Sequence, residues 1–118
     1  MKVGSVVLYA RVVARTAAFY KALGVWLEAR PDGREVGDID GIRVAVVEGR
    51  SGEASPGPAV PGASMIGFRV PSVDEAILAA HQTGGAVLRP IEALDWGRRV
   101  VLTDPDGRPV EVVDDIRT

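Results

Sequence analysis

The sequence of 118 residues has no cysteine and only one histidine, His81. Without cysteine the chain cannot form a disulfide, a thiol nucleophile, a cysteine-ligated zinc site or an iron–sulfur cluster. A single histidine also excludes every site that is built on two or more histidines. Aromatic residues make up only 5% of the chain, so each tryptophan carries weight in the interpretation.

The chain also lacks a strong excess of charge. Lysine and arginine number 14 and aspartate and glutamate 16, which gives a net charge of −2. This balance offers no electrostatic reason to expect a nucleic acid or an anionic membrane as partner. No apolar run approaches the ~18 residues of a membrane span, and no clear cleavage pattern follows Val3–Ala10. We therefore expect a cytoplasmic protein with a single domain over residues 1–118.

Residues 49–64 read GRSGEASPGPAVPGAS, a composition typical of a linker or long loop. The stretch lies near the midpoint, and the two halves on either side of it look alike. In the first module, residues 1–48, a helical stripe over 15–23 ends at Gly24, where a helix C′ glycine belongs. Extended segments are predicted around this helix at 3–9, 25–30, 35–40 and 42–48.

The second module, residues 65–118, repeats this order. Ser72 and Glu75 match a capping box, which predicts a helix running to about Thr83. Extended segments are predicted at 65–70, 86–89, 98–104 and 108–114. Each module is therefore βαβββ, and an α+β fold results in which two sheets, each with one helix, share a core.

Several phrases in this order resemble the vicinal oxygen chelate superfamily, which includes glyoxalase, the bleomycin resistance proteins and extradiol dioxygenases. The phrases are Arg15–Tyr20 with Leu23-Gly24, Gly67–Val70 with Val73-Asp74, Trp96-Gly97-Arg98, Asp104–Gly107 and Val110–Val112. The resemblance covers nearly the whole chain. It implies paired βαβββ modules that form a cup-shaped mixed sheet, a ligand cavity inside the cup, and a homodimer as the usual state.

Metal-dependent members of that superfamily hold a divalent ion with four side chains inside the cup. The resemblance places the four positions on Ser5, Val46 (with Glu48 as an alternative register), Phe68 and Glu111. Only Glu111 has a good ligand side chain, and one carboxylate cannot replace most of the water shell of a divalent cation. The resemblance to the bleomycin resistance branch therefore predicts a protein with no metal and no cofactor.

Glu111 is the candidate catalytic residue. It lies in the apolar segment Val110–Val113, where strand alternation puts Glu111 and Val113 on one face. The functional interpretation points Glu111 into the cavity as a hydrogen-bond acceptor or general base. The alternative is an exposed strand glutamate, or a relic of a metal site.

The remaining candidates are ligand-binding residues. By strand alternation and family register, Ser5, Tyr9 and Phe68 would share the inner surface of the cup with Val46, although Phe68 would equally fill the old metal site. Arg98 and Arg99 point in alternate directions, so only one of them, taken as Arg99, would meet an acidic ligand at the rim of the pocket; the alternative is a solvated pair. Two tryptophans complete the set: Trp96 would cover the mouth of the cavity or plug the core, and Trp26 would line the pocket, a dimer interface or the core.

These observations favour a metal-independent protein that sequesters an aromatic or amphipathic small molecule in the sheet cavity. A lyase or isomerase with Glu111 as general base is the alternative, and metal-dependent glyoxalase or dioxygenase chemistry fits the residues less well. A third hypothesis is a module without a ligand, kept for dimerisation. Bleomycin resistance proteins bind a cationic drug and tend to be acidic, so the mild net charge of −2 does not require a cationic ligand.

Overall fold

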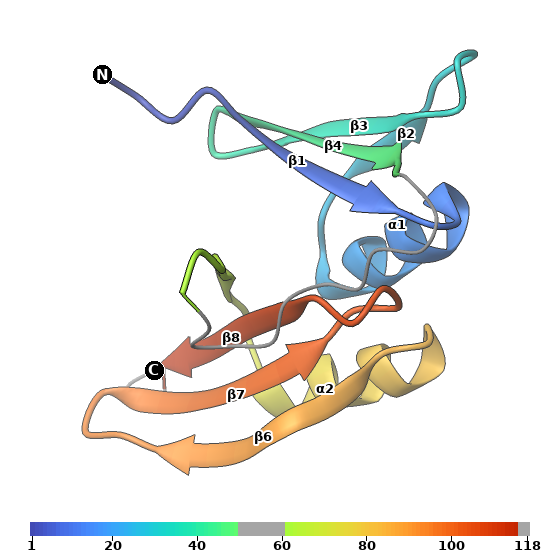
Figure 1. Ribbon diagram of the computed structural model, residues 1–118. Helices are drawn as coiled ribbons and strands as arrows, with labels where there is room; N and C mark the ends of the chain where they lie inside the picture. The colour runs from blue at the N-terminus through green and yellow to red at the C-terminus, as the bar shows by residue number, and fades with distance from the viewer. Residues whose placement is uncertain (50–60, 116–118) are drawn as a thin grey trace.

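The computed structural model describes residues 1–49 and 61–115, in which two βαβββ modules follow one another (Figure 1). Most of the predicted linker, residues 50–60, lies outside the described residues. The first module consists of β1 (Ser5–Ala10), α1 (Val13–Leu23), β2 (Leu27–Ala29), β3 (Glu35–Ile39) and β4 (Ile42–Glu48). The second consists of β5 (Ile66–Arg69), α2 (Val73–Gln82), β6 (Ala86–Ala93), β7 (Gly97–Thr103) and β8 (Pro109–Asp115).

Each module forms a four-stranded mixed sheet with the same internal order. The first sheet has the order β1-β4-β3-β2 and the second β5-β8-β7-β6. In both, the strand before the helix pairs in parallel with the last strand of the module, and the other pairs are antiparallel. The predicted α+β fold with two βαβββ modules is therefore confirmed.

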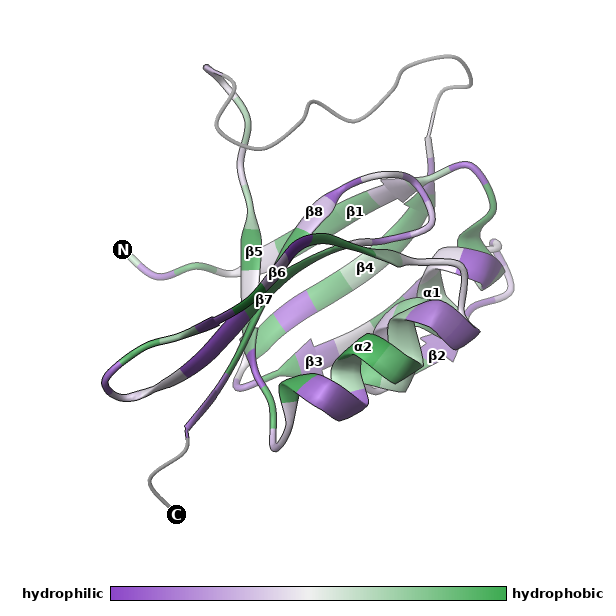
Figure 2. Cartoon of the chain, turned by 90° about the horizontal axis from the view of Figure 1, so that it is seen from below, coloured by the Kyte–Doolittle hydropathy of each residue, from purple (hydrophilic) through white to green (hydrophobic). Residues whose placement is uncertain are grey.

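One hydrophobic core joins the two modules. Each helix packs on its own sheet, and α1 and α2 also contact each other. Figure 1 shows the second sheet facing the viewer with α2 behind it and the first sheet above. The strands are apolar over much of their length: β4, which is mostly green in Figure 2, has four consecutive apolar residues between Arg43 and Glu48. The core side chains come from both halves: Leu8, Phe19, Tyr20, Val44, Val46, Val73, Ala76, Val100, Leu102, Val110 and Val112.

Local sequence signals account for the helix ends. Gly24 has φ +112°, the left-handed conformation that glycine adopts at low cost, and its N–H donates to the carbonyls of Lys21 and Tyr20. The side chain of Ser72 accepts a hydrogen bond from the Glu75 backbone N–H at 3.3 Å. Both predicted signals are confirmed. No helix of the described residues is long and apolar enough to cross a membrane.

A polar cluster fastens the second module to the start of the first. The Asp104 side chain is completely buried in the turn between β7 and β8, and its Oδ2 accepts from the Tyr20 hydroxyl at 2.7 Å. Arg108 Nη1 lies 2.6 Å from the same oxygen. The backbone N–H groups of Asp106 and Arg108 occupy Oδ1, at 2.9 and 3.0 Å. A buried carboxylate thus has its charge and its acceptor capacity satisfied.

The same turn makes three further contacts with the β1–α1 junction. Asp106 accepts from the Arg11 backbone N–H at 3.0 Å and from the Thr16 hydroxyl. The Arg108 guanidinium donates to the backbone carbonyl of Tyr9. The turn therefore fixes where β1 ends relative to the second sheet.

Candidate functional site

The face of each sheet that its helix does not cover is the candidate binding surface, and we call it the open face. On β1, Leu8 and Ala10 turn into the core, while Ser5, Val7 and Tyr9 lie on the open face because side chains alternate along a strand. Val7 is 45% exposed and Tyr9 is 62% exposed. β1 therefore presents an apolar and aromatic strip to the outside, and the exposed Arg43 and Asp38 lie beside Ser5 on the same open face.

Val46 and Phe68 do not lie on the open faces. Val46 pairs with Leu8 in the register and is completely buried. Phe68 pairs with Val112, another core residue, and its ring lies 6.1 Å from that of Tyr20. The expectation that these two residues share a surface with Tyr9 is wrong, because the family register was offset by one residue on both strands and a one-residue offset reverses the face.

The open face of the second sheet carries Glu111 and Arg99. Arg99 Nη1 lies 3.6 Å from Glu111 Oε2, and Arg99 Nη2 lies 2.8 Å from Glu92 Oε2. A Cβ added to Gly67 on β5 would approach Glu111 Oε1 to 3.3 Å, so the carboxylate leans across the neighbouring strand. The glutamate side chain is 30% exposed, which leaves it accessible to a ligand.

Arg98 points the other way, into the helix side of the sheet. Its Nη2 lies 2.7 Å from Asp114 and its Nη1 2.9 Å from Asp74. Asp114 also accepts from the Val73 backbone N–H at 2.8 Å, so the pair caps α2. The hydrogen bond from Arg98 lowers the pKa of the Asp114 carboxyl. Of the two adjacent arginines, only Arg99 lies on the open face.

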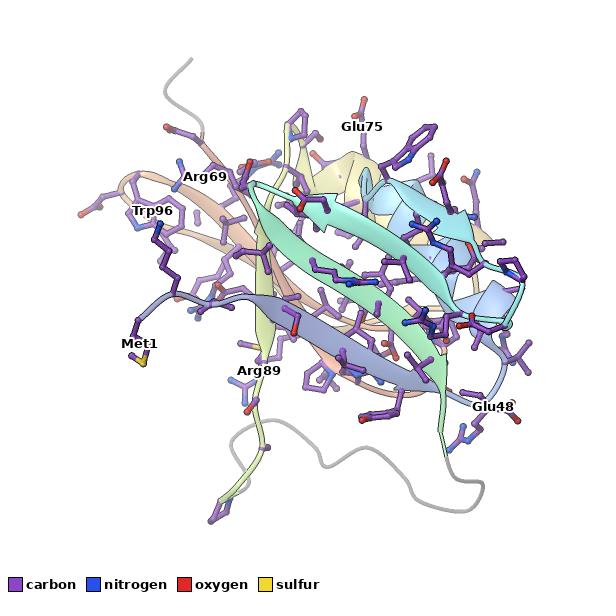
Figure 3. The ribbon with its side chains drawn as sticks, turned by 90° about the horizontal axis from the view of Figure 1, so that it is seen from above. Met1, Glu48, Arg69, Glu75, Arg89 and Trp96 are labelled. Atoms are coloured by element: carbon purple, nitrogen blue, oxygen red, sulfur yellow. The ribbon has the colours of Figure 1, made fainter. Side chains whose placement is uncertain are left out.

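The two tryptophans are both exposed, Trp26 at 71% and Trp96 at 42%, so neither is a core residue. Trp26 precedes β2, which lies at the opposite edge of the first sheet from β1 and Tyr9. Trp96 lies at the tip of the β6–β7 hairpin, next to the second open face. In Figure 3, Trp96 and Arg69 lie near the same end of the second sheet.

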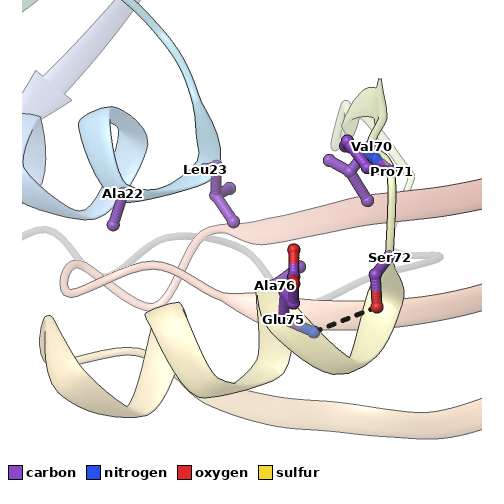
Figure 4. A pocket seen from close by; sticks show the side chains of 7 residues that line it. All are labelled: Ala22, Leu23, Val70, Pro71, Ser72, Glu75 and Ala76. Atoms are coloured by element: carbon purple, nitrogen blue, oxygen red, sulfur yellow. Dashed lines mark hydrogen bonds between the residues drawn. The ribbon is translucent and has the colours of Figure 1, made fainter.

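The structure does not bring these candidates together into one concave site within a chain. Ser5 and Tyr9 lie on the first open face, and Arg99 and Glu111 on the second. Both faces point away from the shared core, in different directions (Figures 1 and 3). A described cavity lies elsewhere, between the end of α1 and the start of α2 (Figure 4). At about 70 Å³ it is far below the size of a typical ligand pocket.

The positions do not fit a divalent metal ion. On the strands in question the open-face residues are Ser5, Ala45 or Val47, Gly67 or Arg69, and Glu111. No group of three histidine, aspartate or glutamate side chains that could hold a metal gathers among residues 1–49 and 61–115. Glu111 alone supplies a strong oxygen donor, which is too few for Mg²⁺, Mn²⁺ or Zn²⁺.

The sequence model of the Glyoxalase/Bleomycin resistance protein/Dioxygenase superfamily matches residues 2–112. The chain belongs to this superfamily. No curated protein shows significant similarity to it. Among solved structures, a hypothetical protein from S. aureus is 21% identical with a TM-score of 0.75, and the match covers 97% of this chain and 93% of that one.

Two further solved structures carry descriptive names. A glyoxalase-related enzyme from Fulvimarina pelagi is 21% identical with a TM-score of 0.73, and the match covers 98% of this chain and 88% of that one. A glyoxalase/bleomycin resistance protein from Albidiferax ferrireducens is 21% identical with a TM-score of 0.72, covering 94% and 96%. At this level of identity the likeness shows the fold.

Proposed function

We propose that the protein is a metal-independent small-molecule binding protein that works as a homodimer. The ligand lies between the first open face of one copy and the second open face of the other. The observation that carries the proposal is the exposed apolar and aromatic surface of β1, with Val7 and Tyr9 left uncovered by the chain's own helix. Such surfaces in soluble proteins mark binding sites.

A second copy explains why one chain has no closed site. Each face offers half of a lining: the apolar and hydroxyl groups of β1 on the first, beside Arg43 and Asp38, and the Arg99–Glu111 pair on the second. Ligand pockets combine an apolar lining with a few polar groups that fix orientation, and the two faces together supply both. This arrangement is also supported by membership of the superfamily, because the resemblance to that superfamily implies a homodimer as the usual state.

Oligomeric state tests the dimer. We expect light scattering to give twice the chain mass of 12.4 kDa. Val7→Arg places a charge between Ser5 and Tyr9, on the β1 edge of the first open face, and should shift the protein to a monomer. Val12→Arg is the matched control, because Val12 is also exposed (55%) but lies at the start of α1. A wild-type monomer at micromolar concentration contradicts the dimer.

Ligand binding is tested with the single-tryptophan variant Trp26→Phe. An aromatic ligand in the site should quench the remaining Trp96 emission, whereas unchanged emission across a broad aromatic panel would contradict the proposal.

Elemental analysis should find no stoichiometric metal. One tightly bound Ni, Zn, Fe or Mn per chain would overturn the metal-independent assignment.

The Arg99–Glu111 pair favours a second candidate, a lyase or isomerase with Glu111 as general base. In this mechanism, Glu111 removes a proton from the ligand, and the neighbouring Arg99 guanidinium stabilises the negative charge of the enolate that forms. An NMR assay in D₂O distinguishes the two functions. An enzyme exchanges an acidic C–H proton of its bound ligand and loses this exchange in Glu111→Gln, whereas a binding protein shows no exchange with either chain.

A further inference from the structure

The open face of the second sheet carries three arginines, two glutamates and one aspartate, and two of the arginines are arranged in one row. Arg69 pairs with Val113, and Val113 pairs with Arg99, so the three residues form one row across β5, β8 and β7 on the same face. Arg89 on β6 pairs with Val101 in the next row of that face. Together with Glu92, Glu111 and Asp115, which follows Val113 on the same face of β8, the face carries three positive and three negative charges.

Two of these arginines have no partner in the part of the chain that the structure describes. Arg99 lies 2.8 Å from Glu92 and 3.6 Å from Glu111. Arg69 and Arg89 make no hydrogen bond or ion pair with any described residue, and both are exposed. Arg69 is the last residue of β5 and Arg89 lies on β6. In Figure 3, Arg69 lies toward the end of the sheet that holds Trp96.

The row formed by Arg69, Val113 and Arg99 has the dimensions of an anion site. Neighbouring strands lie about 4.8 Å apart, so the Cα atoms of the two arginines are about 10 Å apart, and their long side chains can lean toward each other over Val113. Val113 is half-buried and provides an apolar floor. A guanidinium presents parallel N–H groups that match a carboxylate. Arg99 Nη1 forms an ion pair with Glu111 at 3.6 Å, which is longer than a hydrogen bond, so its N–H groups can still donate hydrogen bonds to a second anion.

We propose that the ligand is an aromatic or amphipathic carboxylate, and that its anionic group binds between Arg69 and Arg99. This inference rests on the proposed binding function and names the chemical class of its ligand. The apolar body of the ligand extends from Val113 toward the first open face of the second copy. Glu92 continues to accept the hydrogen bond from Arg99 Nη2 and so holds the guanidinium in place.

Three probes of equal size but different charge test the proposal: 1-naphthoate, 1-naphthalenemethanol and 1-naphthylmethylamine. We expect the carboxylate to bind about tenfold more tightly than the alcohol, because charge-assisted hydrogen bonds to arginine are the stronger kind. Arg69→Gln should remove this preference while the affinity for the alcohol changes less than about twofold. Arg30→Gln is the matched control, since Arg30 is exposed directly after β2 and its loss changes the net charge equally.

The outcomes separate the two proposals. Tightest binding of the amine, or an unchanged preference for the carboxylate in Arg69→Gln, overturns the anionic ligand and leaves the binding function standing. Loss of the preference in Arg30→Gln as well shows that only overall charge matters, which also overturns the site. If none of the three probes binds, the binding function fails and the ligand class fails with it.

Discussion

The hydrogen bond from Tyr20 to Asp104 is the most direct test of how the two modules are joined. Tyr20→Phe removes one oxygen atom from a fully buried ring and keeps its shape. Asp104 Oδ2 loses the donor at 2.7 Å but keeps Arg108 Nη1, and Oδ1 keeps its two backbone donors. The substitution thus isolates one charge-assisted hydrogen bond between the first and second modules.

The expected loss follows from that single bond. A hydrogen bond to a charged group contributes about 1.5–3 kcal/mol, so we expect the free energy of unfolding at pH 7 to fall by about 2 kcal/mol. A domain of 118 residues has an unfolding entropy of about 0.25 kcal/mol/K, which converts this loss into a fall in Tm of about 8 °C.

The loss also depends on pH, with a sign that the structure determines. Burial, with a further contribution from the Asp104 carboxylate, raises the pKa of Tyr20 above the ordinary tyrosine value. Below pH about 10, tyrosine is neutral in both the folded and the unfolded chain. Above it, the unfolded chain ionises and the folded chain does not, which costs the wild type about 1.4 kcal/mol by pH 11. The deficit of Tyr20→Phe should therefore shrink from about 2 kcal/mol to about 0.6 kcal/mol.

Urea denaturation followed by circular dichroism at pH 8, 9, 10 and 11 measures both effects. Tyr9→Phe is the control, because Tyr9 is 62% exposed and its loss should change the free energy of unfolding by less than about 0.5 kcal/mol at pH 8. Equal stability of Tyr20→Phe and wild type at pH 8 would refute the contribution of the bond. A deficit that stays constant from pH 8 to pH 11 would refute the idea that folding keeps this phenol neutral.

Three further predictions concern the second module. Asp114→Asn should destabilise the protein at pH 7, and because the hydrogen bond from Arg98 lowers the pKa of the Asp114 carboxyl, this loss of stability should shrink as pH falls below about 4. An equal loss at pH 7 and pH 3 in urea denaturation would contradict this. Gly97→Ala puts a Cβ 1.9 Å from the Asp114 backbone oxygen and should lower the free energy of unfolding by more than about 3 kcal/mol, whereas Gly67→Ala meets the flexible Glu111 side chain and should lower it by less than about 1 kcal/mol. Equal thermal stability of the two variants would show that the close approach at Gly97 is relieved. Leu102→Ala empties a fully buried position and should cost about 2–5 kcal/mol, and a loss below 1 kcal/mol would mean that the core refills the space.

Local signals were the reliable part of the sequence interpretation. Gly24 and Ser72 predicted the end of one helix and the start of the other, because a left-handed glycine and a capping hydroxyl act on the nearest turn of backbone. The turn residues between strands likewise predicted two βαβββ modules.

The strand β6 is an instructive exception. It was expected to stop at Arg89 and runs on to Ala93, since Pro90 is tolerated in an edge strand whose register is already interrupted.

The candidate site was harder to predict, because it depends on which face each residue takes. Val46 and Phe68 were placed by counting from the family motifs, and an offset of one residue sent both into the core. Glu111 was placed by alternation within its own strand, whereas alternation on β7 allowed only one of Arg98 and Arg99 to point inward; the register and the contact to Glu111 identify it as Arg99. Whether Ser5 and Tyr9 meet Glu111 depends on how the two sheets are oriented, which strand periodicity does not contain.

The polar cluster around Asp104 was missed for a related reason. Asp104–Gly107 was interpreted only as a turn, although Tyr20 on the apolar stripe of α1 brings a hydroxyl into the core. A buried phenol needs a partner, and an aspartate is well suited to accept its hydrogen bond. That requirement was a usable signal, but it does not identify which of the sixteen acidic residues would meet it.

The placement of the two open faces on different sheets has a consequence for mixed populations of chains. In the proposed homodimer, each copy lends its first face to one site and its second face to the other. A variant damaged at Tyr9 and a variant damaged at Arg99 would each form homodimers in which both sites are faulty. A heterodimer of the two has both faults in one site and leaves the other site intact, so it has half of the full binding capacity. A 1:1 mixture that exchanges subunits at random would therefore recover about a quarter of the capacity, although neither chain binds alone.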